Sequence, residues 1–188
     1  MLATYPPSDT LPTTLQTIDE FEHWERQHPH EGSYEFVRGR IIPKPAMKQI
    51  EIFITRFLLR TFIKTAAFEA GNDLLPEMDS YVDGSRKRIP DLTYITAEQR
   101  EAIRRGERVN TLFAIELLSD SETHGEVLEK IQDYFDGGTR LVWYVVPNRQ
   151  QIYAYTSPVA MRVYSATDTI TAAPVIPELS FTVADMFA

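Results

Sequence analysis

Two acidic residues interrupt apolar stretches in the middle of the chain. Asp91 lies within residues 88–95 (RIPDLTYI), and Glu116 lies within residues 113–119 (FAIELLS). Short runs rich in Ile, Phe, Leu and Tyr are typical of strands in a buried sheet. A carboxylate in such a strand costs free energy to bury unless it is paired or holds a cation. Two such acids on neighbouring strands therefore indicate a metal site.

A purely structural interpretation also fits these two acids. Asp91 could cap a turn after Pro90, and Glu116 could form an ion pair with an arginine, since structural ion pairs are common. The two interpretations differ in geometry, because a metal site requires the carboxylates to converge.

Length and composition predict one soluble globular domain. The chain has 188 residues, of which 43% are hydrophobic and 24% charged, enough for a substantial core. It contains no cysteine, which excludes disulfides and thiolate metal sites and fits a reducing compartment. We see no signal-peptide pattern and no apolar stretch that approaches a membrane span. We therefore expect a cytoplasmic protein.

The net charge of 19 − 27 = −8 argues against tight non-specific binding to DNA, which rests on cationic contacts with phosphate. Two groups of basic residues could still form a local basic surface. One is Arg86, Lys87 and Arg88, directly before Asp91, and the other is Arg100, Arg104, Arg105 and Arg108. The alternative is that both groups are solvated faces or loops.

The first part of the chain has clear local signals. Residues 1–16 are rich in Pro, Thr and Ser and predict an extended lead-in to a single domain at 17–188. Thr17 and Glu20 form a capping box for a helix over 18–27. Residues 34–42 predict a hairpin that turns at Arg38-Gly39.

The elements that position the two acids follow the hairpin. The pattern predicts, in order, a long helix over 47–66, a short strand within 68–75, a strand over 88–95, a helix over 96–103, a strand over 112–118, a helix over 122–135 started by a capping cluster at 119–122, a strand over 141–146 and an edge strand over 151–155. This order predicts an α/β fold, with a mixed β-sheet core flanked by helices.

Five segments in this order resemble the PD-(D/E)XK nuclease superfamily and, more closely, the Uma-type restriction endonuclease family within it. The resemblance covers most of the chain. It rests on residues 34–39 (YEFVRG), 88–91 (RIPD), 116–119 (ELLS), 130–134 (KIQDY) with 141–147 (LVWYVVP), and 176–187 (IPELSFTVADMF).

The resemblance implies a restriction-endonuclease-like fold and Mg²⁺-dependent hydrolysis of DNA, with Mn²⁺ as a possible substitute. Asp91 and Glu116 would be the metal ligands, assisted by a backbone carbonyl near Leu117. Glu35 would be an additional acid that holds a second metal or a bound water. Carboxylates suit this chemistry because they hold Mg²⁺ and leave positions open for water and phosphate oxygens. A homodimer is expected by analogy with nucleases that cut both strands.

The chain departs from the pattern at the lysine that usually follows the second acid. The superfamily has this lysine two residues after the acid, where Leu118 stands here. The resemblance offers Lys130 instead, from the next helix. The alternative is that Lys130 is an exposed lysine paired with Glu126. A histidine of the family is also absent at 47–49.

The leading hypothesis is a metal-dependent DNA endonuclease with the catalytic residues Glu35, Asp91, Glu116 and Lys130. Arg86, Lys87 and Arg88 are expected to contact the DNA backbone. The rival hypothesis is a catalytically inactive domain of the same fold that acts as a binding or regulatory module, which the acidic charge and Leu118 favour. A small-molecule metallohydrolase is a third, less supported reading. The four histidines have no metal-ligand spacing and are expected at the surface, although His124 could contact phosphate.

Overall fold

The structure is a computed structural model that describes residues 11–29, 32–119 and 122–188. The first ten residues of the predicted lead-in therefore lie outside the described residues. The helices are α1 (Ile18–Gln27), α2 (Gln49–Phe62), α3 (Ala66–Glu69), α4 (Ala97–Arg104), α5 (His124–Asp136) and α6 (Val183–Phe187). A short 3₁₀ turn, η2, spans Pro147–Arg149.

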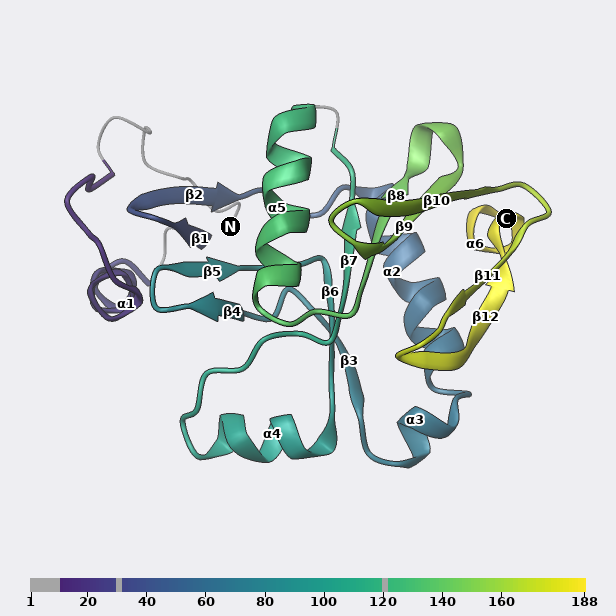
Figure 1. The fold of residues 1–188 in the computed structure, drawn as a ribbon, viewed down its shortest axis with the longest axis horizontal. Helices are drawn as coiled ribbons and strands as arrows, with labels where there is room; N and C mark the ends of the chain where they lie inside the picture. The colour runs from purple at the N-terminus through teal and green to yellow at the C-terminus, as the bar shows by residue number, and fades with distance from the viewer. Residues whose placement is uncertain (1–10, 30–31, 120–121) are drawn as a thin grey trace.

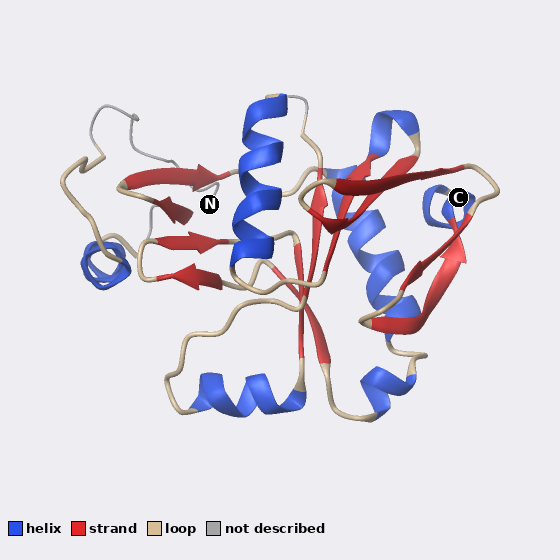
Figure 2. Cartoon of the chain, in the orientation of Figure 1, coloured by secondary structure: helices blue, strands red, loops and turns tan. Residues whose placement is uncertain are grey.

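The strands form three sheets instead of the single mixed sheet that the sequence predicts (Figures 1 and 2). The four-stranded sheet has the order β2-β1-β5-β4, the six-stranded sheet β10-β9-β8-β7-β6-β3, and the third pairs β11 with β12. The strands are β1 (Ser33–Val37), β2 (Arg40–Lys44), β3 (Asp73–Pro76), β4 (Ser80–Asp83), β5 (Arg86–Arg88), β6 (Leu92–Ile95), β7 (Phe113–Leu117), β8 (Leu141–Val146), β9 (Gln151–Ser157), β10 (Ala160–Ser165), β11 (Thr169–Ala172) and β12 (Ile176–Thr182).

The six-stranded sheet is buried on both faces at its centre. Strands β7 and β8 pair in parallel, and α5 connects them, whereas all other neighbours in this sheet are antiparallel. Side chains alternate across the two faces of a strand. Phe113, Ile115 and Leu117 accordingly pack into a large core with α2, β12 and α6, while Ala114 packs into a second core with Ile131 of α5.

The four-stranded sheet is built on the β1–β2 hairpin and also has two different faces. Arg38 and Gly39 form its turn with φ values of 48° and 85°, the left-handed conformation that two-residue hairpin turns require. On one face, Tyr34 and Phe36 form a core with Phe21 of α1. The other face meets α5, which lies between the two larger sheets (Figure 1).

Several predicted elements are confirmed. These are the capping box and helix at α1, the hairpin, the helix capped by Thr96 and the two buried strands β7 and β8.

Other predictions about elements were wrong. The long helix ends at Phe62, and a separate short helix capped by Thr65 follows it. The helix α5 is capped by Thr123 instead of the cluster at 119–122, of which 120 and 121 lie outside the described residues. The strand over 151–155 is not an edge strand, because β10 pairs with it and forms the edge.

The predicted strand over 88–95 is in fact two strands in two sheets. Strand β5 ends at Arg88 in the four-stranded sheet, and β6 begins at Leu92 in the six-stranded sheet. Pro90 lies between them and has no backbone N–H to donate to a ladder. Asp91 therefore follows the break at which the chain passes from one sheet to the other.

None of the helices among the described residues is long and apolar enough to cross a membrane.

Candidate functional site

Glu116 points from β7 toward α5. It lies on the face of β7 opposite to Ile115 and Leu117, because side chains alternate along a strand. Its carboxylate is buried, with 2% exposure. The hydroxyl of Tyr134, from α5, donates a hydrogen bond to Glu116 Oε1. The sequence places Glu116 correctly in a buried strand, and the structure shows a tyrosine as its hydrogen-bond partner.

Asp91 reaches the same place from the segment between β5 and β6. The backbone N–H of Leu117 donates to Asp91 Oδ2 over 2.6 Å. That contact brings Asp91 beside the end of β7, next to Glu116. The prediction that both acids lie on strands is wrong for Asp91, but the expected convergence of the two acids is what the structure contains.

Lys44 joins the two acids and is the residue that the sequence analysis missed. Its ammonium donates to Asp91 Oδ1 over 2.8 Å and lies 3.8 Å from Glu116 Oε2. A signal for it exists in the hairpin. With the turn at Arg38-Gly39, Glu35 lies opposite Ile42. Since residues two apart share a face, Lys44 lies on the same face of the hairpin as Glu35.

Lys130 reaches the site from α5. Its Nζ donates to Glu122 over 2.8 Å and lies 3.7 Å from Glu116 Oε2. Only 14% of its side chain is exposed, so the alternative of a solvent-facing lysine paired with Glu126 was wrong. Glu116 Oε2 thus lies within 4 Å of both Lys44 and Lys130.

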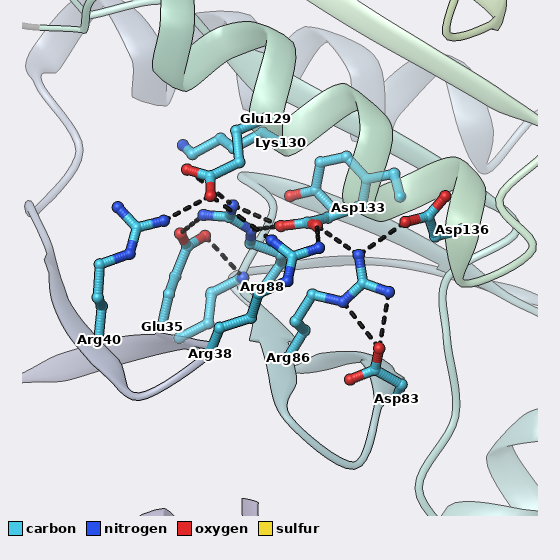
Figure 3. Close-up of polar contacts among 12 residues, drawn as sticks. Glu35, Arg38, Arg40, Asp83, Arg86, Arg88, Glu129, Lys130, Asp133 and Asp136 are labelled. Carbon is cyan, nitrogen blue, oxygen red and sulfur yellow. Dashed lines mark hydrogen bonds and ion pairs between the residues drawn. The ribbon is translucent and has the colours of Figure 1, made fainter. Parts of the chain in front are cut away.

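Glu35 lines the same cavity but turns both oxygens toward other groups. Its Oε2 accepts from Arg88 over 2.9 Å, and its Oε1 accepts from the backbone N–H of Ile89 over 3.0 Å. Arg88 also donates twice to Asp133 of α5 (Figure 3). Glu35 is therefore fixed beside the two convergent acids by an arginine. Its predicted role as a metal ligand stays a prediction.

Arg86, Lys87 and Arg88 are buried, with 8%, 1% and 2% exposure. Arg86 pairs with three carboxylates, including that of Asp133 (Figure 3), and Lys87 pairs with Glu25. A contact between these cations and a DNA backbone would compete with their ion pairs. Arg88 lines the cavity, whereas Arg86 and Lys87 do not, so the expected DNA contacts of these three residues stay a prediction.

The second basic group also pairs with acids. Its ion pairs are Arg100 with Asp73, Arg104 with Glu101, Arg105 with Glu107, and Arg108 with Asp19 and Glu22. These arginines balance neighbouring acids, so the basic surface that the sequence allowed is not formed by them. A basic residue at the site that is more than half exposed is Arg40, with 57% of its side chain exposed.

The residues of the candidate site line one cavity of about 330 Å³. Its wall includes Glu35, Asp91, Glu116 and Lys130, together with Lys44 and Leu117. It also includes Arg40 and, from α5, Glu129, which form an ion pair with each other (Figure 3). The four side chains predicted to be catalytic therefore face one cavity.

The two buried glutamates differ in their charge. Burial raises the pKa of Glu116 to about 7, although Lys130 and Lys44 act in the opposite direction. Burial also acts to raise the pKa of Glu35, but Lys130 and Arg88 outweigh it and lower that pKa below its ordinary value. Glu35 is therefore a carboxylate at neutral pH, while Glu116 is poised between its two forms.

The two lysines remain charged. Burial acts to lower the pKa of Lys130 and of Lys44, but neighbouring carboxylates, Glu116 first among them, raise both values above the ordinary range. Each ammonium is therefore a fixed positive charge beside Glu116.

The donor set suits a hard divalent cation. Within the described residues there is no group of three or more acidic, histidine or cysteine side chains arranged to hold a metal. Mg²⁺ does not need one, since it is usually bound by one or two carboxylates plus waters and phosphate oxygens. Asp91 and Glu116 already share a cation in the form of the Lys44 ammonium. These two acids fit Mg²⁺ or Mn²⁺.

The three histidines among the described residues contribute no ligands to this site. His23 contacts Gln27, and His28 contacts the backbone of Trp24. His124 is the first residue of α5 and does not line the cavity. His30 lies outside the described residues.

Comparison with solved structures confirms the predicted α/β, restriction-endonuclease-like fold. The crystal structure of a "putative nuclease belonging to DUF820" from Anabaena variabilis matches with a TM-score of 0.75 and 21% sequence identity, over 91% of this chain and 97% of that one. Residues 18–184 match the Uma2 family, described as "Putative restriction endonuclease". The chain belongs to this Uma2 family. No curated protein matches it.

Proposed function

We propose that this protein is a metal-dependent DNA endonuclease that hydrolyses phosphodiester bonds. The observation that carries the proposal is the convergence of Asp91 and Glu116 on one cation, the Lys44 ammonium, at 2.8 and 3.8 Å. Membership of the Uma2 family supports the same reaction class. Two buried carboxylates that meet in an open cavity beside a second lysine form a typical site for metal-assisted hydrolysis.

Asp91 and Glu116 would hold Mg²⁺, with the backbone carbonyl at Leu117 as a further oxygen ligand. A bound Mg²⁺ supplies a Lewis acid for the phosphate and lowers the pKa of a coordinated water. Glu35 is the next acid along the cavity wall. Because Arg88 and Ile89 occupy its oxygens, we assign it the smaller role of holding a water or a second cation.

The remaining residues orient these groups. The N–H of Leu117 fixes one oxygen of Asp91, and the hydroxyl of Tyr134 fixes one oxygen of Glu116. Lys130 carries a positive charge into the cavity from α5. Its ammonium would orient the attacking water or contact the scissile phosphate, a role that the strand cannot fill at Leu118.

An inactive binding module of the same fold is the second candidate, and the charge of the cavity favours it. The acids on the cavity wall outnumber the basic residues, so a phosphate would be repelled in the absence of a divalent cation. The two candidates differ in one respect. The nuclease cleaves DNA only when a divalent cation is present, and the binding module does not cleave it at all.

The test is cleavage of supercoiled plasmid by the purified protein in Mg²⁺ or Mn²⁺, with EDTA as the metal-free reaction. We expect nicked or linear DNA with the wild type and a loss of at least 100-fold in rate for Asp91→Asn and for Glu116→Gln. Glu107→Gln is the matched control, because Glu107 is an exposed acid outside the cavity. It should cleave at the wild-type rate.

Two outcomes would overturn the proposal. One is the absence of cleavage by the wild type under all metal conditions, which would leave the binding module. The other is equal cleavage by the wild type, Asp91→Asn and Glu116→Gln, which would indicate a contaminating nuclease or a different site. An RNA substrate in parallel would establish which nucleic acid is preferred.

A further inference from the structure

Lys44 has an unusual position for a lysine. It is 9% exposed, at the end of β2, and its ammonium contacts the two acids to which we assign the metal. A metal ligand needs free oxygen lone pairs on the side that faces the cation. The ammonium of Lys44 lies on that side of Asp91 and Glu116, because it is within 4 Å of an oxygen from each.

The backbone of Lys44 is more restrained than its side chain. Lys44 lies between Pro43 and Pro45 and pairs with Ser33 in the hairpin. A residue that precedes proline is held in an extended conformation. The lysine stem, in contrast, has four rotatable carbons and a compact charge at its tip. The cavity that Lys44 lines gives this charge room to move without any shift of β2.

Lys130 differs from Lys44 in its partners. Its shortest contact is with Glu122, at 2.8 Å, and it lies 3.7 Å from Glu116. A cation between Asp91 and Glu116 would leave the contact with Glu122 intact. Among the described residues, the shortest ion pair of Lys44 is instead with Asp91 itself, so the same cation would compete directly with Lys44.

We propose that Lys44 is a built-in competitor for the metal: its ammonium neutralises Asp91 and Glu116 in the metal-free protein, and a divalent cation must displace it to bind. The proposal rests on the proposed function in its choice of ligands. In the metal-free state Lys44 prevents two buried carboxylates from repelling each other. When the cation enters, the ammonium moves into the cavity, where it can contact a phosphate.

The competition has a measurable consequence in the absence of DNA. Removal of the ammonium removes the competitor, so the two carboxylates should bind metal more tightly. The contact to be broken is a charge-assisted hydrogen bond, and its loss corresponds to an affinity gain of about tenfold. The metal should also raise the melting temperature of the variant more than that of the wild type, because tighter binding stabilises the folded state.

The experiment is titration calorimetry of DNA-free protein with Mn²⁺, for the wild type, Lys44→Met and Lys44→Gln. Both variants should bind Mn²⁺ about tenfold more tightly than the wild type. Lys44→Arg, which keeps a positive charge, should not. Lys87→Met is the matched control, because Lys87 is also a buried lysine in an ion pair of the same sheet but does not line the cavity. Its Mn²⁺ affinity should equal that of the wild type.

Equal or weaker binding of Mn²⁺ by folded Lys44→Met and Lys44→Gln would overturn the proposal, and so would an equal gain in Lys87→Met. Circular dichroism of each variant establishes that it is folded, and Lys44→Gln serves if Lys44→Met does not fold. The result is independent of cleavage. Tighter Mn²⁺ binding by the Lys44 variants without any cleavage of DNA would support the competition and refute the nuclease. Cleavage of DNA with unchanged Mn²⁺ affinity would support the nuclease and refute the competition.

Discussion

Replacement of Glu116 by glutamine should remove a loss of stability that the metal-free wild type suffers as the pH rises. Burial raises the pKa of Glu116 to about 7 from an ordinary value of 4.5. Between these two pH values the folded protein keeps a proton that the unfolded chain has released. Stability therefore falls as the pH rises from about 4.5 to about 7, and the loss is complete above that range. Glutamine does not titrate, so Glu116→Gln escapes the loss.

The size of the effect follows from the distance between the two pKa values. The difference of 7 − 4.5, at about 1.4 kcal/mol per pH unit, gives roughly 3 kcal/mol in total. Part of it is already present at pH 5.5, where the unfolded chain has released most of its protons. About 2 kcal/mol should develop between pH 5.5 and pH 8.5. Solvent screening does not reduce this free energy, since Glu116 is 2% exposed.

The assay is urea unfolding with EDTA at pH 5.5 and pH 8.5, both above the isoelectric point of about 5.0. Glu35→Gln is the matched control, because Glu35 is another buried acid of the cavity whose pKa is lowered. Its charged form contributes stability above its unfolded pKa and loses that contribution only as the pH falls below about 4.5. Glu35→Gln should therefore be less stable than the wild type at both pH values.

Either of two results would show that Glu116 and Glu35 do not differ in their pKa. In one, the stability difference between Glu116→Gln and the wild type stays the same from pH 5.5 to pH 8.5. In the other, Glu116→Gln and Glu35→Gln respond to pH alike. Each result would mean that the two buried acids are not held in different charge states by their surroundings.

Three further substitutions have expected outcomes in the same unfolding assay. Tyr134→Phe removes the hydroxyl that donates to Glu116. It should lower the free energy of unfolding by about 1–3 kcal/mol at pH 8.5, since it leaves a buried acceptor unsatisfied. An unchanged free energy of unfolding would mean that this hydrogen bond does not stabilise the protein. Arg88→Met leaves two buried carboxylates without their arginine and should cost about 3–5 kcal/mol, with partial recovery when the glutamate partner is also made neutral. Gly137→Ala places a Cβ 2.9 Å from the side chain of Asn110 and should cost about 1–3 kcal/mol; wild-type stability would show that Asn110 can move away.

The sequence predicts the elements whose signals are local. The hairpin follows from Arg38-Gly39, because glycine can take the positive φ that a tight turn requires, and the structure contains this turn. Strands β7 and β8 follow from short apolar runs, which are typical of strands buried on both faces of a sheet. The structure contains both strands. These two strands and α5 position Glu116 and Lys130, which line the same cavity.

Two errors came from signals that were present but outweighed. Pro90 indicates a break within 88–95, but the prediction followed the apolar residues around it and gave one continuous strand. The structure has two strands there. Thr65 caps a new helix, and the apolar face of the preceding residues favoured an extension of the long one. In both cases periodicity was given more weight than a residue that interrupts it.

The pairing of charges depends on contacts between distant segments. Arg88 meets Asp133, which lies 45 residues away, and the sequence alone does not reveal that the two sheets enclose α5. Arg86, Lys87 and Arg88 therefore resembled an exposed basic patch. Lys44 is different, because the register of the hairpin places it on the face of Glu35 and it could have been found by counting from the turn.

The central claim is that Asp91 and Glu116 hold the metal that cleaves DNA, and its most direct test is the rate of plasmid cleavage by Asp91→Asn over a series of Mn²⁺ concentrations. Asp91→Asn keeps the shape of the side chain and removes the charge that contacts Lys44. We expect a rate at least 100-fold below that of the wild type at each Mn²⁺ concentration at which the wild type cleaves. Cleavage by Asp91→Asn at the wild-type rate and with the same Mn²⁺ dependence would contradict it.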